Sequence, residues 1–460
     1  PRMCFKKCKT MKFINNTSDI LLSLGVEGNH NTVIKDFQID SRKVSKHSVF
    51  IGLTGSHEDG SIYSDHALQR GAALTIIKAQ KHSPLLKLSA NTLAVSSPER
   101  ALITLAKSAL KKFNHPVIGI TGSNGKTTTK NILNSGIKKS FSTFKNYNNE
   151  IGLPLSTLML DSTNKAAIFE MGAAKKGDIE FLSKIIKPDI GIITHIGHSH
   201  LAGLNSLRGV LDVKSELVLN IESNGVAILP NGEHVKHWKG LRNDISFLTF
   251  GLDAKASFFA SNIEMTKTGT SFSIESKYLT RKFNVRTALL GDHNILNVLA
   301  AFIATHQLNE DLEFFLESLK VFKNGSQRLH LQPWINQSTL IDDSYNANPD
   351  SVKAAIDVLA KFTGRRILLL GDMKELGRYR KKFHKQIGEY AKIKGLDLFL
   401  GFGELTKYSI ESFGSSGKFF KSKAALTAFL KKEISKNDYV LLKGSRGMHM
   451  EQFIKIEESI

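Results

Sequence analysis

Residues 121–128 carry the sequence Thr-Gly-Ser-Asn-Gly-Lys-Thr-Thr, between an apolar stretch at 116–120 and a helical pattern that follows. Glycines let backbone N–H groups approach phosphate oxygens, and the start of a helix adds positive potential. Lys126 could reach the β- and γ-phosphates of a nucleotide, and the Thr127 hydroxyl suits Mg²⁺. The usual P-loop spacing would need glycine at Ile120, so this is a shorter variant, Gly-x-x-Gly-Lys-Thr. The flanking strand and helix favour a phosphate-binding loop over a simple turn with a solvent-exposed lysine.

The pattern around this loop alternates short apolar strands with helical stretches, which predicts an α/β fold with parallel sheets. In the middle of the chain we expect strands at 116–121, 166–170 and 189–194, helices at 127–139, 179–186, 205–221 and 294–306, and a β-meander at 256–290. Further strands are expected at 339–342, 366–370, 396–400 and 438–442. Pro116 follows a helical pattern at 99–113 and marks a boundary. We therefore predict three domains, at 1–112, 113–325 and 326–460.

Composition excludes several classes of protein. The chain has 460 residues, of which 41% are hydrophobic, enough for two or three domains. No run approaches the ~18 apolar residues of a membrane-spanning helix, so no membrane insertion is expected. Cys4 and Cys8 are the two cysteines, which excludes a disulfide scaffold and fits a reducing, cytoplasmic compartment. Residues 1–10 are basic, lack the apolar region of a secretory signal, and are interpreted as an extension before Met11 or a remnant of a transit peptide.

The charge balance indicates anionic partners. Lys and Arg number 63 against 42 Asp and Glu, giving a net charge of +21. Nucleic acid, a membrane surface and phosphorylated small molecules would all suit such a chain. The lysines are scattered in twos and threes, however, which favours a solvated surface over a dedicated nucleic-acid stripe.

Polar residues at expected strand ends are the next candidates. Glu170 closes the strand at 166–170, where its carboxylate could bind Mg²⁺, although a capping or surface role is equally open from this residue alone. His195, His198 and His200 follow the strand at 189–194, and one of them could border a nucleotide site. A zinc site is not expected, because no cysteine or second histidine pair completes it. Lys214 alone is typical of a surface lysine.

Several segments together resemble the Mur ligase family, the ATP-dependent amide-forming enzymes of peptidoglycan precursor synthesis. Residues 121–128 are shared across that family. Other segments more selectively resemble the member that joins D-alanyl-D-alanine to UDP-N-acetylmuramoyl-tripeptide. They are 146–154 (NYNNEIGLP), 170–173 (EMGA), 343–349 (DSYNANP), 371–377 (GDMKELG) and 443–446 (KGSR), with Asp40-Ser41-Arg42 and Asp59-Gly60 resembling its UDP-sugar domain. The resemblance runs from about Met11 to the end of the chain.

The resemblance implies a fold and a reaction. The fold is an N-terminal α/β domain for the UDP-substrate, a central P-loop mononucleotide-binding ATPase domain and a C-terminal Rossmann-like domain. The reaction uses ATP and Mg²⁺, with two metal sites, to activate the tripeptide carboxylate as an acyl phosphate. The amine of D-alanyl-D-alanine then displaces phosphate. The partners implied are these small molecules, with no specific nucleic acid, for a monomeric enzyme.

Site residues are also implied by position. Nucleotide contacts fall to Gly122, Ser123, Asn124, Gly125, Lys126, Thr127, Thr128, Asn294, Asn297, Arg328 and Asp343. Metal contacts fall to Thr127, Glu170, His200 and Lys214, the last where the family has a lysine that is often carbamylated. Lys126, Lys214 and His200 are the catalytic candidates. Substrate contacts fall to Ser41, Arg42, Asn148, Asn149, Tyr345, Asn346, Lys443, Ser445 and Arg446.

Two departures from the family pattern lie beside the second metal position. His195 stands where relatives usually have Asn, and Ala202 where they usually have Glu. These departures keep open a degenerate homologue that binds nucleotide without ligating. A Mur ligase that adds a single amino acid is a competing hypothesis, against which residues 343–349 argue. A basic P-loop ATPase stimulated by nucleic acid is another.

Overall fold

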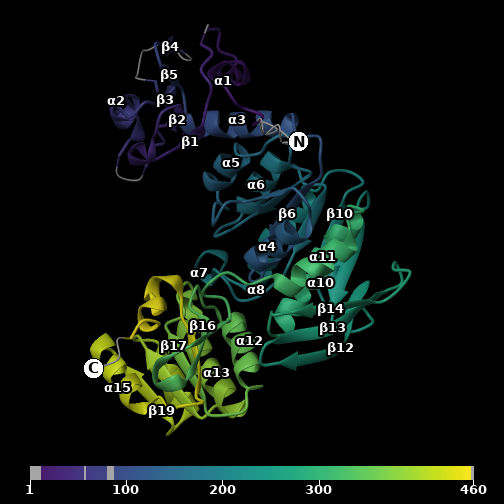
Figure 1. Cartoon of the computed structure of the whole chain (residues 1–460), viewed down its shortest axis with the longest axis vertical. Coiled ribbons are helices and arrows are strands. Elements are labelled where there is room, and N and C mark those ends of the chain that lie inside the picture. Colours follow the sequence, from purple (N-terminus) through teal and green to yellow (C-terminus); the bar gives the residue numbers. More distant parts are fainter. Residues whose placement is uncertain (1–11, 29, 56–57, 80–86, 457–460) are drawn as a thin grey trace, which may run out of the picture.

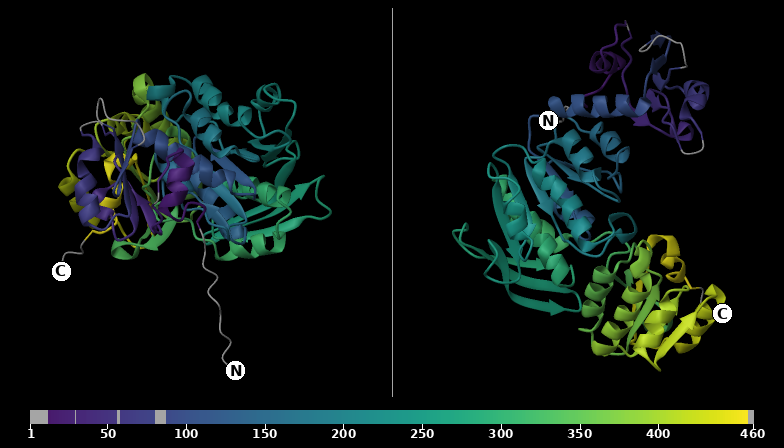
Figure 2. Two further views of the ribbon diagram at one scale, coloured as in Figure 1. Left: turned by 90° about the horizontal axis from the view of Figure 1, so that it is seen from above. Right: turned by 180° about the vertical axis from the view of Figure 1, so that it is seen from behind.

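The computed structural model describes residues 12–28, 30–55, 58–79 and 87–456. The interpretation of residues 1–10 as an extension lies outside these residues. The chain forms three α/β units along an arc, with the N-terminal unit at one end, the C-terminal unit at the other, and the central unit between them (Figures 1 and 2). The predicted three-domain α/β fold is confirmed, and its boundaries after residues 112 and 325 stay predictions.

The N-terminal unit is built on a sheet whose described strands run in the order β1-β2-β3-β5-β4. β4 is antiparallel to β5, and the other pairs are parallel. The strands are β1 (Asp36–Gln38), β2 (Ser48–Ile51), β3 (Leu74–Lys78), β4 (Lys87–Ser89) and β5 (Thr92–Val95), and the helices are α1 (Thr17–Leu24), α2 (Ser64–Gln69) and α3 (Pro98–Lys111). Ser97 caps α3 and Pro98 occupies its first turn, a strong helix start.

The central unit holds the largest sheet of the described chain, in the order β14-β13-β12-β11-β10-β9-β6-β8-β7. The strands are β6 (Val117–Thr121), β7 (Ser140–Ser142), β8 (Ala166–Glu170), β9 (Ile190–Ile193), β10 (Val226–Pro230), β11 (Ser246–Gly251), β12 (Phe258–Thr266), β13 (Gly269–Ser276) and β14 (Phe283–Thr287). The helices are α4 (Lys126–Gly136), α5 (Gly152–Thr157), α6 (Asp178–Ile186), α7 (Leu201–Leu204), α8 (Leu207–Leu219), α9 (Val235–Lys239), α10 (Asp292–Gln307) and α11 (Leu312–Val321). The strands from β7 to β12 pair in parallel, and the predicted meander continues the same sheet as antiparallel β12, β13 and β14.

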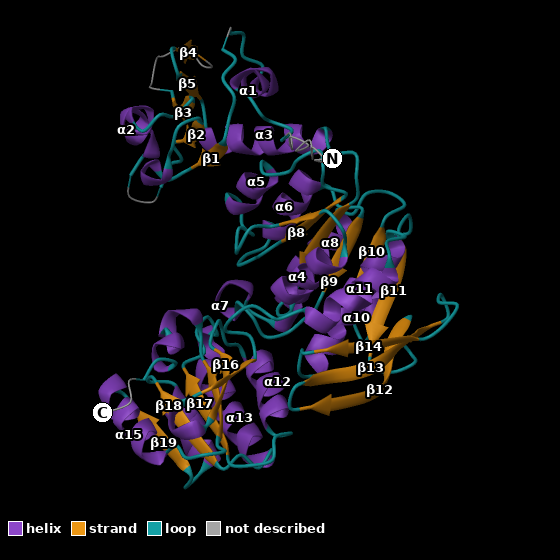
Figure 3. Ribbon diagram, viewed as in Figure 1, coloured by secondary structure: helices purple, strands orange, loops and turns teal. Residues whose placement is uncertain are grey.

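The middle strands of this sheet are buried on both faces, as parallel strands under helices require. In β6, Ile118 and Ile120 pack in the cluster that includes α4, α10 and α11, whereas Val117 packs in the cluster that includes α6 and α8. Figure 3 shows these helices against the strands. The helix predicted at 127–139 ends earlier, because Ile137 already has the extended dihedrals φ −112° and ψ 118°. The helices packed on both faces therefore hold the carboxyl edge of the sheet, and the P-loop that follows β6, in a fixed position.

The C-terminal unit has a sheet with the described order β15-β16-β20-β17-β18-β19. Its strands are β15 (His330–Pro333), β16 (Thr339–Asp343), β17 (Arg366–Gly371), β18 (Leu398–Phe402), β19 (Gly417–Phe420) and β20 (Tyr439–Lys443), and its helices are α12 (Pro349–Leu359), α13 (Arg380–Ile393), α14 (Thr406–Phe413) and α15 (Lys423–Glu433). The predicted parallel sheet is confirmed, with two unpredicted strands at its edges: β19 pairs in parallel with β18, and β15 is antiparallel to β16.

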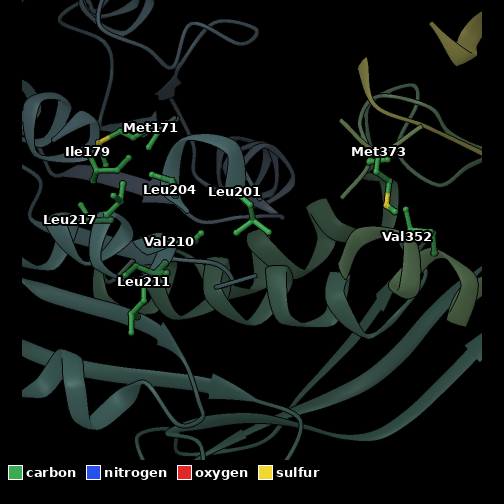
Figure 4. Packing of buried hydrophobic residues seen from close by; sticks show 14 of the residues in the cluster. Met171, Ile179, Leu201, Leu204, Val210, Leu211, Leu217, Val352 and Met373 are labelled. Atoms are coloured by element: carbon green, nitrogen blue, oxygen red, sulfur yellow. The ribbon is translucent and has the colours of Figure 1, made fainter. Parts of the chain in front are cut away.

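One apolar cluster continues from the central unit into the C-terminal unit. It contains Leu201 and Leu204 of α7 together with Val352 of α12 and Met373, which follows β17. Figure 4 shows one group of its side chains around Met171 and another at Val352 and Met373. The two units are therefore in contact through apolar side chains as well as through the polar groups described below. In the described residues, no helix is long and apolar enough to cross a membrane.

Candidate active site

A cavity of about 1520 Å³ opens between the central and C-terminal units. The predicted site residues that line it are Ser123, Asn124, Gly125, Lys126, Thr127, Thr128, Asn148, Asn149, Glu170, His200, Asn294, Asn297, Arg328, Asp343, Tyr345, Asn346, Lys443, Ser445 and Arg446. Four other predicted residues, Gly122, Lys214, Ser41 and Arg42, are absent from the lining. Most of the predicted site is thus assembled at one interdomain surface.

The P-loop joins β6 to α4 through two glycines with positive φ. Gly122 has φ 146° and Gly125 has φ 86°, a region that L side chains rarely adopt. A Cβ at Gly122 would lie 2.1 Å from Thr194 Oγ1, and one at Gly125 would lie 2.3 Å from Asn297 Oδ1. These glycines therefore allow the backbone to pass close to both neighbours, and the loop leads its amides into the start of an eleven-residue helix.

Lys126 folds back over this loop. Its ammonium donates to the carbonyl of Gly122 at 2.6 Å. Desolvation by burial lowers the pKa of Lys126, Glu170 opposes that shift, and Arg328 adds to it. The cation is therefore held within the cavity wall beside the loop, where an anionic phosphate would stabilise its charged form.

Glu170 ends β8 with a carboxylate that is only half satisfied. Its Oε1 accepts a hydrogen bond from Asn148 Nδ2 at 2.9 Å, whereas its buried Oε2 has no hydrogen-bond partner. Lys130 Nζ lies 3.7 Å from that Oε2, and both side chains are only 4% exposed. Glu170 also lines the cavity, and a carboxylate with an oxygen that lacks a hydrogen-bond partner is a suitable ligand for a hard cation.

Lys130 was not predicted from the sequence, yet it organises this corner of the site. Its ammonium donates to the carbonyls of Thr143 at 2.9 Å and Lys145 at 3.1 Å. Burial is the largest cause that lowers the pKa of Lys130, and Glu170 raises it in return. Its spacing puts it one helical turn beyond Lys126 on the same face of α4, which indicates the direction of the side chain but not its burial.

Lys214 is buried in α8 behind the cavity wall and is only 1% exposed. Burial, and then the neighbouring cation of Lys126, lower the pKa of Lys214 to about 7, while Asp178 and Glu216 oppose the shift. A large fraction of this amine is therefore neutral, and hence nucleophilic, near neutral pH. The structure thus corrects the interpretation of Lys214 as a surface lysine.

The three histidines after β9 all line the cavity. His200 Nδ1 lies 2.6 Å from Glu375 Oε2, and this contact lowers the pKa of the Glu375 carboxyl. His198 Nδ1 lies 3.2 Å from Asp350 Oδ2, so both histidines meet carboxylates of the C-terminal unit. Burial lowers the pKa of His195, so its imidazole is kept neutral.

The departure at Ala202 is accompanied by a contact from the opposite unit. The backbone N–H of Ala202 donates to the carbonyl oxygen of Glu375 at 3.0 Å. Glu375 therefore brings a carboxylate to His200 from the C-terminal unit, next to the position where the resemblance expects a glutamate. The sequence offered no local signal for this contact, because it joins a residue of α7 to a residue of the C-terminal unit that is distant in the chain.

The C-terminal unit contributes charged groups that are themselves paired. Arg328 Nη2 donates to Thr127 Oγ1 at 3.2 Å, and its guanidinium lies 4.2 Å from the centre of the Tyr345 ring. Lys443 Nζ lies 2.5 Å from Asp343 Oδ2 and also donates to the carbonyl of Asn346 at 2.9 Å. These pairs place two cations at the wall that faces the P-loop.

The amide residues of α10 lie beside the P-loop. Asn294 Nδ2 donates to the carbonyl of Leu290 at 2.9 Å, and Asn297 Nδ2 donates to Asn294 Oδ1 at 3.1 Å. Thr129 Oγ1 donates to Asn297 Oδ1 at 3.3 Å, which links this pair to α4. Both asparagines are thereby fixed at one edge of the cavity.

Ser41 and Arg42 lie in the N-terminal unit, away from these residues. Ser41 Oγ is hydrogen-bonded to His66 Nδ1 at 3.0 Å. The Arg42 guanidinium donates to both carboxylate oxygens of Asp40, at 2.9 and 3.0 Å, and lies exposed at the surface. A role for them requires a ligand long enough to extend from the cavity to the N-terminal unit.

The fold and site define a class, the three-domain P-loop nucleotide-binding proteins with their site between domains. Three family models match this chain. "Mur ligase family, catalytic domain" matches residues 33–109, "Mur ligase middle domain" matches residues 120–305, and "Mur ligase, glutamate ligase domain" matches residues 327–446. The chain belongs to the Mur ligase family.

Individual relatives agree with this assignment. The chain is 33% identical to the UDP-N-acetylmuramoyl-tripeptide–D-alanyl-D-alanine ligase of Buchnera aphidicola subsp. Baizongia pistaciae, over 97% of each protein. It is 32% identical to the Bacillus subtilis ligase of the same name, over 92% of this chain and 93% of the relative. Among solved structures, MurF from Acinetobacter baumannii has a TM-score of 0.87 at 27% identity, covering 95% of this chain and 97% of that one. MurF from Thermotoga maritima in complex with ADP has a TM-score of 0.82 at 27% identity, covering 92% and 96%.

Proposed function

We propose that this protein is the ATP-dependent ligase that joins D-alanyl-D-alanine to UDP-N-acetylmuramoyl-tripeptide in peptidoglycan precursor synthesis. The observation that carries the proposal is a cavity between two units, which brings the P-loop and Glu170 opposite Asp343, Tyr345 and Lys443. The names of the full-length relatives, and the ADP bound by one structural neighbour, support the substrates and the nucleotide.

The first step is phosphoryl transfer. A carboxylate oxygen of the tripeptide attacks the γ-phosphorus of ATP, and the bond from that phosphorus to the β–γ bridging oxygen breaks. ADP departs, and the tripeptide carboxylate has become an acyl phosphate. The loop amides and Lys126 hold the phosphates and offset the charge that develops during transfer. Arg328 contacts Thr127 from the C-terminal unit, so we assign it and Asp343 to the nucleotide as well. Asn294 and Asn297 are assigned to the adenine side.

The residues around Glu170 suit a divalent cation. The Glu170 Oε2 lacks a hydrogen-bond partner, and Thr127 offers a hydroxyl oxygen on the same wall. No group of three or more metal-type His, Cys, Asp or Glu side chains occurs in the described part of the chain. Mg²⁺ fits such a sparse set, because it keeps waters and shares its coordination with substrate phosphates. When bound, the ion would neutralise phosphate charge; Thr127 and Glu170 are proposed to hold it.

A second ion is proposed at His200 with Lys214. The neutral amine of Lys214 can attack dissolved CO₂, lose a proton and become a carbamate, which converts a buried cation into an oxygen ligand. The lowered pKa of Lys214, about 7, supplies the neutral amine that this reaction needs. His200 keeps its Nε2 available, because its Nδ1 is turned to Glu375.

The second step forms the amide. The amine of D-alanyl-D-alanine attacks the acyl carbon, the tetrahedral intermediate expels phosphate, and a proton is lost from nitrogen. We assign Asn148 and Asn149 to the substrate on the central side. Tyr345, Asn346, Lys443, Ser445 and Arg446 are assigned to it on the C-terminal side, and Ser41 and Arg42 to its UDP end.

We place this reaction in the cytoplasm and expect a monomer, since one chain carries both walls of the cavity. His195 and Ala202 do not remove the groups assigned here. His195 is kept neutral by burial, and Glu375 supplies a carboxylate beside His200. We therefore favour an active ligase over a degenerate homologue.

The test is phosphate release from the purified protein with Mg-ATP, adding UDP-N-acetylmuramoyl-tripeptide and D-alanyl-D-alanine separately and together. Mass spectrometry detects the product. Release that requires both substrates, with a product heavier by the dipeptide less one water, is the expected result.

Three results would contradict the proposal in distinguishable ways. A single amino acid that replaces the dipeptide efficiently would indicate a different ligase of the family. Release that is stimulated only by nucleic acid, with a steep salt dependence, would indicate a P-loop ATPase of another kind. No release under any condition, with nucleotide still bound, would indicate the degenerate homologue.

A further inference from the structure

The first turn of α12 touches the P-loop directly through a pair of asparagine side chains. Asn348, the N-cap of α12, donates from Nδ2 to Asn124 Oδ1 at 2.8 Å. Asn124 Nδ2 donates in return to Asn348 Oδ1 at 3.2 Å. Two amides that exchange both hydrogen bonds fix their relative distance and orientation, which a single hydrogen bond does not. This pair joins the nucleotide-binding loop to the C-terminal unit.

The helix cap determines which way the Asn348 amide faces. Its Oδ1 accepts from the backbone N–H of Ser351 at 2.9 Å, and Ser351 Oγ accepts from the backbone N–H of Asn348 at 3.0 Å. Because the cap needs an oxygen acceptor, the NH₂ group of Asn348 is left for Asn124. The start of α12 therefore presents a fixed donor to the P-loop.

Asn124 is held from the opposite side by the central sheet. Its backbone carbonyl accepts from Thr194 Oγ1 at 2.5 Å, just beyond the end of β9. Asn124 precedes Gly125, whose φ of 86° permits the turn into α4. The position of the Asn124 side chain thus bears on the part of the loop whose amides are proposed to hold the phosphates.

A second contact from the same helix turn reaches the loop indirectly. The Asp350 carboxylate accepts from the backbone N–H of His198 at 2.6 Å. The turn that contains His198 is bonded to Ser123, because Ser123 N donates to His195 O at 2.8 Å and Ser123 Oγ donates to Gly197 O at 2.9 Å. The first turn of α12 therefore contacts two consecutive residues of the P-loop. Asn348 binds Asn124 directly, and Asp350 is linked to Ser123 through the turn that contains His198.

We propose that Asn348 is a positioning residue for phosphoryl transfer that acts through Asn124. When the C-terminal unit closes on the central unit, the amide pair holds Asn124 and the amides beside it in the arrangement that the transferring phosphate requires. Closure of the C-terminal unit on the central unit then also forms the competent nucleotide site. This inference rests on the proposed ligase reaction and assigns Asn348 no contact with substrate.

The test replaces Asn348 while keeping the helix cap. Serine is as good an N-cap as asparagine, so Asn348→Ser removes the amide and leaves α12 capped. Loss of two neutral hydrogen bonds at a closure contact is expected to lower kcat about tenfold. The KM for ATP should change less than about threefold and the thermal midpoint by less than about 2 °C, since the P-loop and the cap remain.

Ser351→Ala is the matched control. It removes a cap partner from the same helix turn and leaves the amide pair in place. We expect it to lower the thermal midpoint while kcat stays within about twofold of the wild type. A fall in kcat that simply follows the stability of α12 in both variants would overturn the proposal.

A double-mutant cycle asks whether Asn348 acts through Asn124. The variants Asn124→Ser and Asn124→Ser/Asn348→Ser should have equal kcat, because the amide pair through which Asn348 contacts the P-loop is already lost once Asn124 is replaced. If Asn348→Ser lowers kcat by the same factor in both backgrounds, Asn348 acts by another route and the proposal fails. Wild-type kcat in Asn348→Ser overturns it as well.

Small-angle X-ray scattering separates this inference from the proposed reaction. Wild type should become more compact on adding a non-hydrolysable ATP analogue, and Asn348→Ser should show clearly less of this change. If the wild type does not ligate, the proposed function fails. The role of the Asn124–Asn348 contact in closure is then tested by the change in compactness alone. Equal compaction of the two proteins would then overturn the inference.

Discussion

Replacing Lys130 with methionine should destabilise the central unit far more than replacing an exposed lysine nearby. Lys130 is almost fully buried, donates to the carbonyls of Thr143 and Lys145, and lies 3.7 Å from Glu170 Oε2. Methionine has a similar length and fills the space, but it carries no donor and no charge. The substitution therefore leaves two carbonyls and one buried carboxylate without their cation.

The size of the effect follows from these contacts. Breaking a buried ion pair by removing one partner costs about 3–5 kcal/mol, because the remaining charge is uncompensated. Glu170 keeps its hydrogen bond from Asn148, and the substitution also removes the desolvation cost of the Lys130 ammonium, so we expect the lower end, about 3 kcal/mol. At about 2–4 °C for each kcal/mol in a domain of 150–250 residues, the thermal midpoint should fall by roughly 6–12 °C.

The assay is thermal unfolding followed by tryptophan fluorescence. The chain has two tryptophans, and Trp238 is fully buried in the central unit. A Trp334→Phe background therefore reports the central unit alone, which matters because multidomain proteins need not unfold in one step. The control is Lys138→Met, since Lys138 is exposed and pairs with Asp311 at 3.2 Å. That surface pair should contribute less than about 1 kcal/mol.

Two results would refute the reasoning. The first is a midpoint for Lys130→Met that matches Lys138→Met, which would mean that the buried contacts contribute no more than a surface pair. The second concerns Lys130→Met/Glu170→Gln, which removes the unpaired charge and should recover part of the lost stability. No recovery would show that the orphaned carboxylate is not the source of the cost.

Three further predictions concern the nucleotide and metal groups. Since the pKa of Lys214 is about 7 in the folded chain against 10.5 for a free lysine, the unfolded chain binds the extra proton above pH 7, so stability should rise with pH. Between pH 7.5 and 9.0 in CO₂-free buffer, wild type should gain about 2 kcal/mol relative to Lys214→Met in urea unfolding; equal pH profiles contradict a buried, titrating amine. Gly125→Ala places a Cβ 2.3 Å from Asn297 Oδ1 at φ 86°, so fluorescent ADP should bind at least about tenfold more weakly, and unchanged binding refutes the close approach. Glu170→Gln should weaken Mn²⁺ binding, measured by electron paramagnetic resonance with ADP present, by about tenfold or more, whereas equal affinity removes Glu170 from the metal site.

Much of the fold was determined locally. Apolar runs such as 166–170 and glycines at 122 and 125 express backbone preferences that need no distant partner, so the strand, loop and helix around Lys126 were predicted closely. The β-meander at 256–290 was predicted for the same reason. Its place in the central sheet was not, because pairing of β11 with β12 depends on registry between segments and not on the pattern of either one.

The candidate site divides in the same way. The sequence by itself indicated Lys126, Thr127 and Glu170 as candidates for phosphate and metal binding, since they stand in patterns that are readable within a few positions. Only the tertiary structure decided which of the many lysines is buried, and it placed Lys130 at Glu170 and Lys214 behind Lys126. Burial depends on what packs around a side chain, and a lysine's spacing cannot report that.

The contact between Asn124 and Asn348 shows the limit most clearly. The two residues are 224 positions apart and lie in different units, Asn124 in the loop after β6 and Asn348 at the start of α12. Each asparagine has an adequate local interpretation, one as part of a phosphate loop and the other as a helix cap. Their meeting depends on how the central and C-terminal units pack through the shared apolar cluster, because long-range contacts follow from the packing of whole units and not from the preferences of single residues.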